Sequence, residues 1–324
     1  MFPEGNLRQS FEYGEISKAA FPRTKVVRMS VASNEEPVGI IQGIYSSYFG
    51  FGMDLKVMRG PVTLVGDKRS SEITGKLLEA LENYCKRNRV IHGQIFVPEA
   101  WQVDEVFKKY GYTLAEKMSE YTINLGRDAN LLWKRIDHNK RRNIKRAMDA
   151  GVKVIESHNH EDLPVFYSLF ENAAERHSFQ TNPLSYFEAI WKTWPPELSR
   201  VFLANWDGKS VSGVFVAAHG KTVYGLAAGS LIEASKVRPN DIMHWKVMEW
   251  AIKNGFSAYQ IGLISEPLPV EGSKDWGIWR WKREWNGNLN RIQIFSKYYL
   301  TRYKFVLKAK EFAERGYTFF KQLR

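Results

Sequence analysis

Alternating apolar and polar positions dominate the first third of the chain, a pattern typical of short strands with one buried face. The predicted strands cover residues 25–31, 38–48, 54–58, 90–97 and 120–125. Apolar residues that recur every three or four positions predict amphipathic helices over 70–87 and 101–110. Together these elements predict a compact α/β unit that ends near Gly126.

A helical pattern begins after Asn130 and ends at Gly151, a residue type that favours the end of a helix. The predicted apolar side of this helix carries Leu132, Ile136, Ile144 and Met148. Its other side carries a basic cluster, Lys134-Arg135, Lys140-Arg141-Arg142 and Lys145-Arg146. Further helices are predicted over 162–177, 183–194 and 240–254, and further strands over 200–205, 210–218, 222–228 and 258–263.

Strand hairpins followed by a helix and another strand occur in both halves, which predicts a duplicated fold. Because 324 residues exceed the usual size of one hydrophobic core, we predict two domains, residues 1–128 and 129–296. A basic helix over 298–323 closes the chain, and we expect the segment 297–324 to pack back on the first domain.

The start of the chain lacks the basic and apolar regions of a signal peptide, and no apolar run approaches the ~20 residues that span a bilayer. We therefore expect no transmembrane segment and a cytoplasmic location. The single cysteine, Cys85, cannot form an internal disulfide and falls within a predicted helix. We interpret it as a buried structural thiol.

The charge balance favours an anionic partner. Lys and Arg number 47 against 35 Asp and Glu, a formal net charge of +12. Such a chain attracts nucleic acids, nucleotides or anionic lipids. The basic cluster at 134–146 concentrates this charge, although a solvated helix face is the alternative interpretation of such a run.

Several short motifs follow one another along the chain. In the first half they are Gln9-Ser10 with Tyr13-Gly14, and Arg59-Gly60-Pro61-Val62. In the second half they are the basic segment 133–152, Ala174-Glu175-Arg176-His177 with Asn182-Pro183 and Tyr186-Phe187, Tyr259-Gln260-Ile261-Gly262-Leu263, and Trp281-Lys282-Arg283-Glu284-Trp285. In this order they resemble the motifs of the Fem family, aminoacyl transferases that build peptidoglycan cross-bridges.

The resemblance implies an α/β (α+β) fold of two tandem GNAT-like domains, with the acceptor in a cleft of one domain and the active channel in the second. It also implies transfer of an amino acid from aminoacyl-tRNA to an amine of a peptidoglycan precursor. The second domain contains no inserted pattern for the helical coiled-coil arm of the long members. The chain therefore resembles the short, armless type.

Four positions depart from the family pattern. Gln260 and Leu263 replace an aspartate and a glycine, Ala227 lies where a substrate-contacting tyrosine is expected, and Ser17 lies where some members place a phosphate-binding lysine. Tyr224 and Lys18 are close enough in sequence to substitute for the last two. We therefore predict both as substrate-binding residues.

Lys282 is the predicted catalytic residue. An aminoacyl ester or acyl thioester is already activated, so the enzyme needs chiefly to position the amine and to stabilise the oxyanion. The rings of Trp281 and Trp285, predicted as substrate-binding, would line a dry channel in which a lysine charge acts strongly. The alternative is a surface lysine whose stem covers two core tryptophans.

Arg176 is the predicted contact to acceptor phosphates, because its planar guanidinium matches phosphate oxygens. The alternative is an ion pair with Glu175 or Glu171 at the helix end. His177 follows directly, and because adjacent helical residues face apart, we do not expect it to enter the same site.

Other chemistry lacks its sequence pattern. We find no metal-ligand spacing and no nucleophile elbow, and we expect no resident cofactor or metal. The glycine-rich CoA loop of acetyltransferases is missing between Ser230 and Asp241. This favours a tRNA donor, whose acceptor end would meet Lys236 and Arg238.

Three functions remain open from the sequence. The first is aminoacyl transfer from aminoacyl-tRNA to an amine of an anionic, phosphate-bearing cell-wall precursor. The second is N-acylation of an amino sugar or another amine of an envelope polysaccharide or lipid, with acyl-CoA as the donor. The third is non-catalytic binding of a nucleic acid or envelope precursor. The charge also leaves open a peripheral contact with the inner membrane surface.

Overall fold

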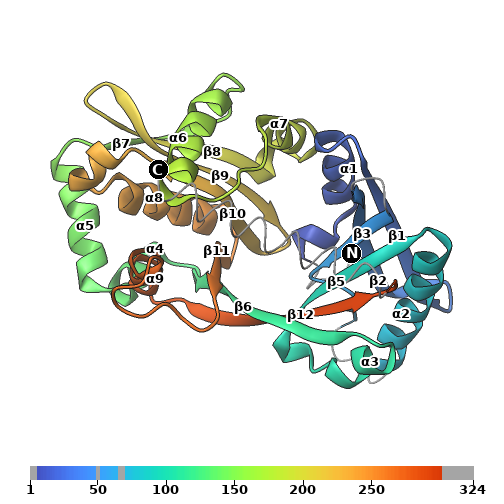
Figure 1. Cartoon of the computed structure of the whole chain (residues 1–324). Helices are drawn as coiled ribbons and strands as arrows, with labels where there is room; N and C mark the ends of the chain where they lie inside the picture. The colour runs from blue at the N-terminus through green and yellow to red at the C-terminus, as the bar shows by residue number, and fades with distance from the viewer. Residues whose placement is uncertain (1–5, 49–51, 65–69, 301–324) are drawn as a thin grey trace. The chain divides into compact units, whose positions relative to one another are not determined.

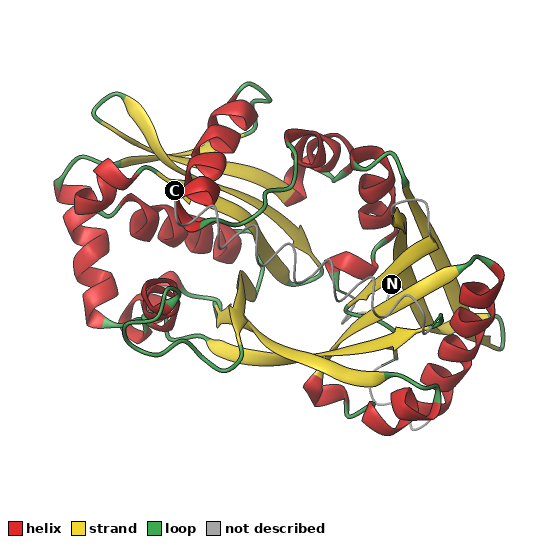
Figure 2. Cartoon of the chain, viewed as in Figure 1, coloured by secondary structure: helices red, strands yellow, loops and turns green. Residues whose placement is uncertain are grey.

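The chain forms two compact α/β units in a computed structural model that describes residues 6–48, 52–64 and 70–300. Unit 1 extends to Glu116 and resumes at Ile292, whereas unit 2 comprises Lys117–Arg291. Both combine a sheet with helices, as Figure 1 and Figure 2 show. The predicted limits 1–128, 129–296 and 297–324 stay a prediction, because a compact unit is not by itself an independently folding domain.

Unit 1 is built on a mixed sheet in the order β1-β2-β3-β5-β12, with the short β4 beside β2. Its strands are β1 (Thr24–Ser33), β2 (Glu36–Tyr48), β3 (Gly52–Met58), β4 (Val62–Thr63), β5 (Val90–Pro98) and β12 (Asn288–Tyr298, in this unit from Ile292). Its helices are α1 (Phe11–Ala20), α2 (Ser70–Arg87) and α3 (Asp104–Lys109), with short 3-10 turns at Leu7–Gln9 and Glu99–Trp101.

The core of unit 1 forms where α2 covers the sheet. Leu77, Leu78 and Leu81 of α2 are fully buried, as their spacing predicts. Cys85 lies on the same face and is buried, and burial raises the pKa of its thiol to about 11. The predicted burial of this thiol is confirmed, and a raised pKa does not favour a nucleophilic role.

The two motifs of the first half meet in unit 1. The Gln9 amide donates hydrogen bonds to the backbone carbonyls of Gln42 and Met58, at 3.0 and 2.8 Å. Gly60 leaves room for this side chain, because a Cβ at position 60 would lie 2.7 Å from Gln9. Ser10 caps α1 by accepting a hydrogen bond from the Tyr13 backbone. The two motifs therefore connect the start of the chain to strands β2 and β3 of unit 1.

Unit 2 is built on a sheet in the order β6-β11-β10-β9-β8-β7. Its strands are β6 (Thr113–Asn124, in this unit from Lys117), β7 (Lys153–Ser157), β8 (Ser199–Trp206), β9 (Lys209–His219), β10 (Thr222–Ser230) and β11 (Ala258–Ser265). Its helices are α4 (Ala129–Arg135), α5 (His138–Asp149), α6 (Asp162–His177), α7 (Leu184–Thr193), α8 (Pro239–Lys253) and α9 (Trp276–Arg283), with 3-10 turns at Pro196–Leu198 and Ile232–Val237.

Strand β9 shows how helices come to cover both faces of this sheet. Its residues alternate between the two faces. Phe215 packs against Phe166 of α6 and Phe187 of α7, with ring centroids 5.8 and 5.5 Å apart. Val214 and Val216 join the core cluster to which the buried residues of α8 also belong. In Figure 1, α6 and α8 accordingly lie on opposite sides of β8, β9 and β10.

The helix predicted after Asn130 is in fact two helices. The first ends at Arg135, and Asp137 starts the second by accepting a hydrogen bond from the Asn139 backbone. The break changes which residues face inward. Lys140 of the predicted basic side is completely buried, whereas Met148 of the predicted apolar side is 45% exposed.

The sequence did not predict helices α1 and α9 or strands β4, β7 and β12. The helix predicted over 101–110 begins only at Asp104. Tyr298, the predicted start of the closing basic helix, ends β12, and residues 301–323 of that helix lie outside the described residues. In the part of the chain that the structure describes, no helix has the length and apolar content needed to cross a membrane.

Candidate active site

The site in unit 2 begins where two parallel strands separate. Strands β10 and β11 pair only from Thr222 to Tyr224 and from Ala258 to Gln260. Each strand has an irregular register at this point, after Gly225 in β10 and after Gln260 in β11. Irregularities of this kind bend a strand. Beyond them the two strands no longer pair, and their residues line a cavity.

This transfer cavity has a volume of about 820 Å³. Its walls come from the end of α6, strands β10 and β11, helix α8, and helix α9 with the residues before it. Most of the lining side chains are apolar or aromatic. The charged residues among them are Arg176, Lys274 and Lys282, and none of the described lining residues is acidic. The cavity therefore suits an anionic substrate with apolar parts.

Lys282 lines the transfer cavity and is only 7% exposed. Its ammonium donates a hydrogen bond of 2.9 Å to the backbone carbonyl of Leu263. Burial lowers its pKa from 10.5 to about 8, because the charged form loses hydration. At neutral pH the side chain still carries mainly a positive charge, in surroundings where a charge acts over a longer range than in water.

Gly262, the glycine of the Tyr-Gln-Ile-Gly-Leu motif, helps to explain the contact between Lys282 and the Leu263 carbonyl. Gly262 has a φ of +89°, a conformation that L side chains rarely adopt, and it lies within the irregular part of β11. A Cβ on Gly262 would lie 3.4 Å from the Lys282 ammonium. Gly262 thus shapes the strand from which Leu263 presents its carbonyl to Lys282. Gln260 points elsewhere, since its amide donates to the Glu120 carboxylate at 2.6 Å.

Arg176 and His177, at the end of α6, both line the transfer cavity. The expectation that only one of them would do so is wrong. Arg176 and His177 are the last two residues of α6, and the cavity extends around this helix end far enough to contact both. Arg176 donates a hydrogen bond of 3.2 Å to the Asn172 side chain. The described residues form no ion pair between Arg176 and Glu171 or Glu175.

The pKa of His177 is lowered by burial and by the positive charges of Arg176 and Lys274. His177 is therefore mainly neutral at neutral pH.

The other predicted substrate-binding residues have different surroundings. Trp281 lines the transfer cavity, whereas Trp285 is completely buried behind it, with ring centroids 5.9 Å apart. Tyr224 lies in β10 before the strands separate and is not among the lining residues. Lys18 belongs to α1 of unit 1, where it forms an ion pair with Glu15 at 2.5 Å.

Of the positions that depart from the family pattern, Leu263 lines the transfer cavity, whereas Ala227 and Ser17 do not. Ala227 is buried, and Gly225, Ala228 and Gly229 line the cavity in its place. The Ser17 hydroxyl donates to the backbone carbonyl of Tyr13 within α1. Neither Ala227 nor Ser17 is therefore among the residues that line the described cavity.

His244 of α8 is a lining residue that sequence reasoning missed. One ring nitrogen forms a hydrogen bond of 2.8 Å with the Tyr259 hydroxyl. Burial, followed by the charges of Lys140 and Lys282, lowers the pKa of His244 to about 3. His244 therefore presents a neutral imidazole to the cavity. One indirect signal in the sequence could have identified His244 as a site residue. It lies one helical turn after Asn240, on the predicted helix that precedes the Tyr259 motif.

A buried ion cluster supports Trp281 from behind. The Lys140 ammonium is 2.7 Å from Asp241 and 3.2 Å from Glu284, and it lies 4.8 Å from the ring centre of Trp281. The Trp281 indole donates to the same Asp241 carboxylate at 2.7 Å. Because a buried charge is costly unless it is paired, this cluster fixes the tryptophan in one orientation.

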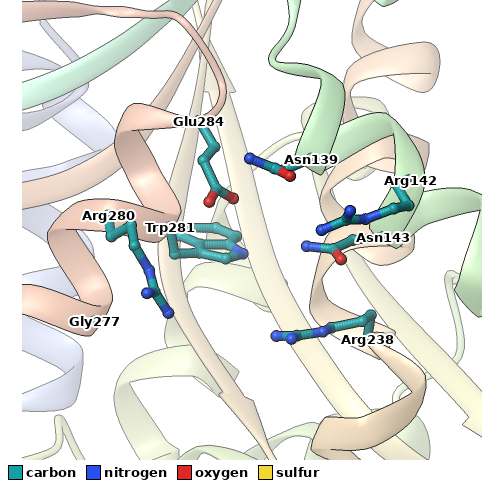
Figure 3. A pocket seen from close by; sticks show the side chains of 8 residues that line it. All are labelled: Asn139, Arg142, Asn143, Arg238, Gly277, Arg280, Trp281 and Glu284. Atoms are coloured by element: carbon teal, nitrogen blue, oxygen red, sulfur yellow. The ribbon is translucent and has the colours of Figure 1, made fainter.

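A second pocket of about 450 Å³ shares Trp281 and Gly277 with the transfer cavity. Figure 3 shows the side chains of Arg142, Arg238 and Arg280 around it. Arg238 was predicted to contact a nucleic acid and lies here. Lys236 was predicted with it but lines neither pocket, and its ammonium lies 5.4 Å from the Trp206 ring centre. In the described ranges, no group of acidic, histidine or cysteine residues could hold a metal ion.

The chain is similar to known acyl and aminoacyl transferases. The model of the acetyltransferase (GNAT) domain family matches residues 134–283, which include Arg176 and Lys282. The chain is 26% identical to UDP-N-acetylmuramoylpentapeptide-lysine N(6)-alanyltransferase of Weissella viridescens, over 37% of this chain and 36% of that protein. It is 22% identical to lipid II:glycine glycyltransferase of Staphylococcus saprophyticus, over 89% of this chain and 86% of the relative.

Solved structures show the same fold. The crystal structure of FemX superposes with a TM-score of 0.78 at 18% identity, covering 94% of this chain and 95% of FemX. A tandem GNAT protein of the clavulanic acid biosynthesis pathway superposes with a TM-score of 0.58 at 13% identity, covering 87% of this chain and 86% of that protein.

The fold and these relatives define a transferase with tandem GNAT-type domains, so the predictions of the fold and of a transferase enzyme are confirmed. The predicted resemblance to the Fem transferases is confirmed as well. Across the described residues no coiled-coil arm is present.

Proposed function

We propose that the chain transfers an aminoacyl group from aminoacyl-tRNA to an amine of a phosphate-bearing peptidoglycan precursor. The observation that carries the proposal is the transfer cavity, whose charged lining residues, Arg176, Lys274 and Lys282, are all basic. The two relatives add support, since both are named for transfer of an amino acid, one to a UDP-linked muropeptide and the other to lipid II.

Lys282 stabilises the negative charge that develops during transfer. The acceptor amine attacks the ester carbonyl, and the carbonyl oxygen becomes an oxyanion beside the Lys282 ammonium. The ester C–O bond then breaks, an amide forms, and the tRNA leaves with a free ribose hydroxyl. The proton lost by the amine goes to that hydroxyl or to water. Because the donor ester is already activated, this reaction needs no resident cofactor.

Arg176 contacts the acceptor's phosphate at the exposed end of the cavity. Its guanidinium pairs with no described carboxylate, so it is available to phosphate oxygens. The reaction takes place in the cytoplasm, where aminoacyl-tRNA is found. A membrane-linked acceptor would bring the basic chain to the inner membrane surface as a peripheral contact.

Acyl transfer from acyl-CoA to an amine of an envelope polysaccharide or lipid is the second candidate. The match to the acetyltransferase domain model over residues 134–283 favours it. Both donors are activated acyl compounds attached to a nucleotide, so the same lysine and cavity would serve either.

The two candidates are separated by a product assay. The purified chain is incubated with a mixture of aminoacyl-tRNAs and UDP-linked muropeptides, and the peptides are analysed by mass spectrometry. The proposal predicts a peptide heavier by one amino-acid residue, and deacylated tRNA is the control that gives no product. Transfer from acyl-CoA with no product from any aminoacyl-tRNA would favour the second candidate and contradict the first.

A further inference from the structure

The pocket beside the transfer cavity combines arginines from three separate elements. Arg142 comes from α5, Arg238 from the residue before α8, and Arg280 from α9. They are far apart in the sequence, yet their side chains gather around one pocket of about 450 Å³ (Figure 3). We call this the arginine pocket.

The three guanidinium groups have no partner in the described part of the protein. No ion pair and no side-chain hydrogen bond joins Arg142, Arg238 or Arg280 to another described residue. Glu284 is the one acidic residue among the described lining residues, and it already lies 3.2 Å from the buried Lys140 ammonium. Three like charges in one pocket repel one another unless an anion binds between them.

The chemistry of the lining favours phosphate among anions. Each guanidinium presents a planar fork of N–H donors that matches two phosphate oxygens. Asn139 and Asn143 of α5 add amide groups to the same wall. The pocket also lies at the start of α8, where the helix dipole favours negative charge.

The position of the pocket connects it to the transfer reaction. Trp281 and Gly277 line both the arginine pocket and the transfer cavity, so the two adjoin at these residues. Asp241 and Lys140 fix the Trp281 ring between the two. Lys282 follows Trp281 directly and reaches the transfer cavity.

We propose that Arg142, Arg238 and Arg280 bind the phosphate groups of a nucleotide-linked acyl donor, while the acyl group of that donor lies beyond Trp281 beside Lys282. The inference deepens the function proposed above and rests on it. The shared chemistry is a phosphate ester of an adenine nucleotide. The 3′ end of a tRNA is one source of it, and coenzyme A is the other.

The test is a binding measurement that needs no turnover. The probe is the RNA tetranucleotide ACCA with a fluorescent label at its 5′ end, and binding is followed by anisotropy at several salt concentrations. Arg142→Gln and Arg280→Gln should each weaken binding about tenfold and lower the salt slope by about 0.7, as expected when one phosphate contact to a single strand is lost. Lys145→Gln is the matched control, since Lys145 is an exposed cation of α5 that lines neither pocket.

Competition with unlabelled coenzyme A identifies the source. Displacement of the RNA by coenzyme A, with the same sensitivity to Arg142→Gln, would assign the pocket to coenzyme A phosphates. Equal losses in Arg142→Gln and Lys145→Gln, or no loss in either arginine variant, would overturn the inference. Because transfer is not measured, RNA binding through these arginines without any product would contradict the proposed function alone. Product formation with unaffected variants would contradict this inference alone.

Discussion

Three basic side chains carry the proposed chemistry at the residue scale. Lys282 is buried and held by the Leu263 carbonyl, Arg176 is exposed at the end of α6, and Lys274 lies on the segment before α9. Lys282 differs from the other two because burial lowers its pKa to about 8. Its charge can therefore be titrated at mildly alkaline pH.

The first prediction concerns pH. A charge on Lys282 is present below its pKa of about 8 and is lost as the pH rises through that value. The kcat of the wild type should therefore fall above about pH 8, whereas Lys282→Arg should keep its own rate at higher pH, since guanidinium stays charged. The measurement is kcat at saturating substrates over a pH series. The same falling limb in both proteins would show that another group titrates.

The second prediction concerns Arg176. If it contacts acceptor phosphate, Arg176→Ala removes an interaction made equally in the ground state and the transition state. The acceptor KM should then rise about tenfold with weaker salt dependence, while kcat stays near the wild-type value. Lys192→Ala is the control, because Lys192 is an exposed cation of α7 that lines neither pocket. An unchanged KM would mean that Arg176 serves only its contact to Asn172.

At the element scale, the site depends on how closely α6 approaches β10. Gly229 of β10 allows this approach, since a Cβ there would lie 2.1 Å from the Leu169 carbonyl oxygen of α6. Gly229→Ala should destabilise the fold by about 1–3 kcal/mol, as overpacking does, and displace the helix that carries Arg176. Gly75→Ala on α2 meets only ordinary contacts and should be neutral or stabilising in thermal unfolding. Equal melting temperatures for wild type and Gly229→Ala would contradict this account of the contact.

Much of the element pattern follows from local sequence. The predicted bounds of α2 and α6 agree with the structure, because both have a regular apolar spacing. The break between α4 and α5 was missed, because Asp137 fits a continuous helix as easily as a cap. Lys140 was placed on the basic side of the predicted helix, because the position of its partner Asp241, 101 residues further along the chain, could not be known.

The site was predictable only in part for the same reason. Lys282, Arg176 and Trp281 belong to short motifs, and all three line the transfer cavity. The separation of β10 and β11 depends on the pairing of whole strands, which no local pattern contains. His244 was missed because its partner Tyr259 lies on another element. The arginine pocket was missed because its residues come from three elements that meet only in the folded chain.

At the scale of the whole molecule, the net charge of +12 and the two basic pockets of unit 2 point to the same substrates. A positive surface raises the rate at which anionic substrates arrive, and this effect weakens with salt. The arginine pocket would bind the phosphates of the donor, and the transfer cavity would bind its reacting acyl group. In the proposed arrangement, donor phosphates lie on one side of Trp281, and the reacting carbonyl lies on the other.

The central claim is that the charge of Lys282 stabilises the transition state of acyl transfer within this cavity. The measurement that tests it most directly is the single-turnover rate of aminoacyl transfer by Lys282→Ala and by wild type, with donor and acceptor both saturating. The account predicts a rate lower by about 10²-fold, as for the loss of one oxyanion donor, with donor and acceptor affinities little changed. Equal rates in a folded variant would contradict it and would leave Lys282 as a structural residue that supports Leu263.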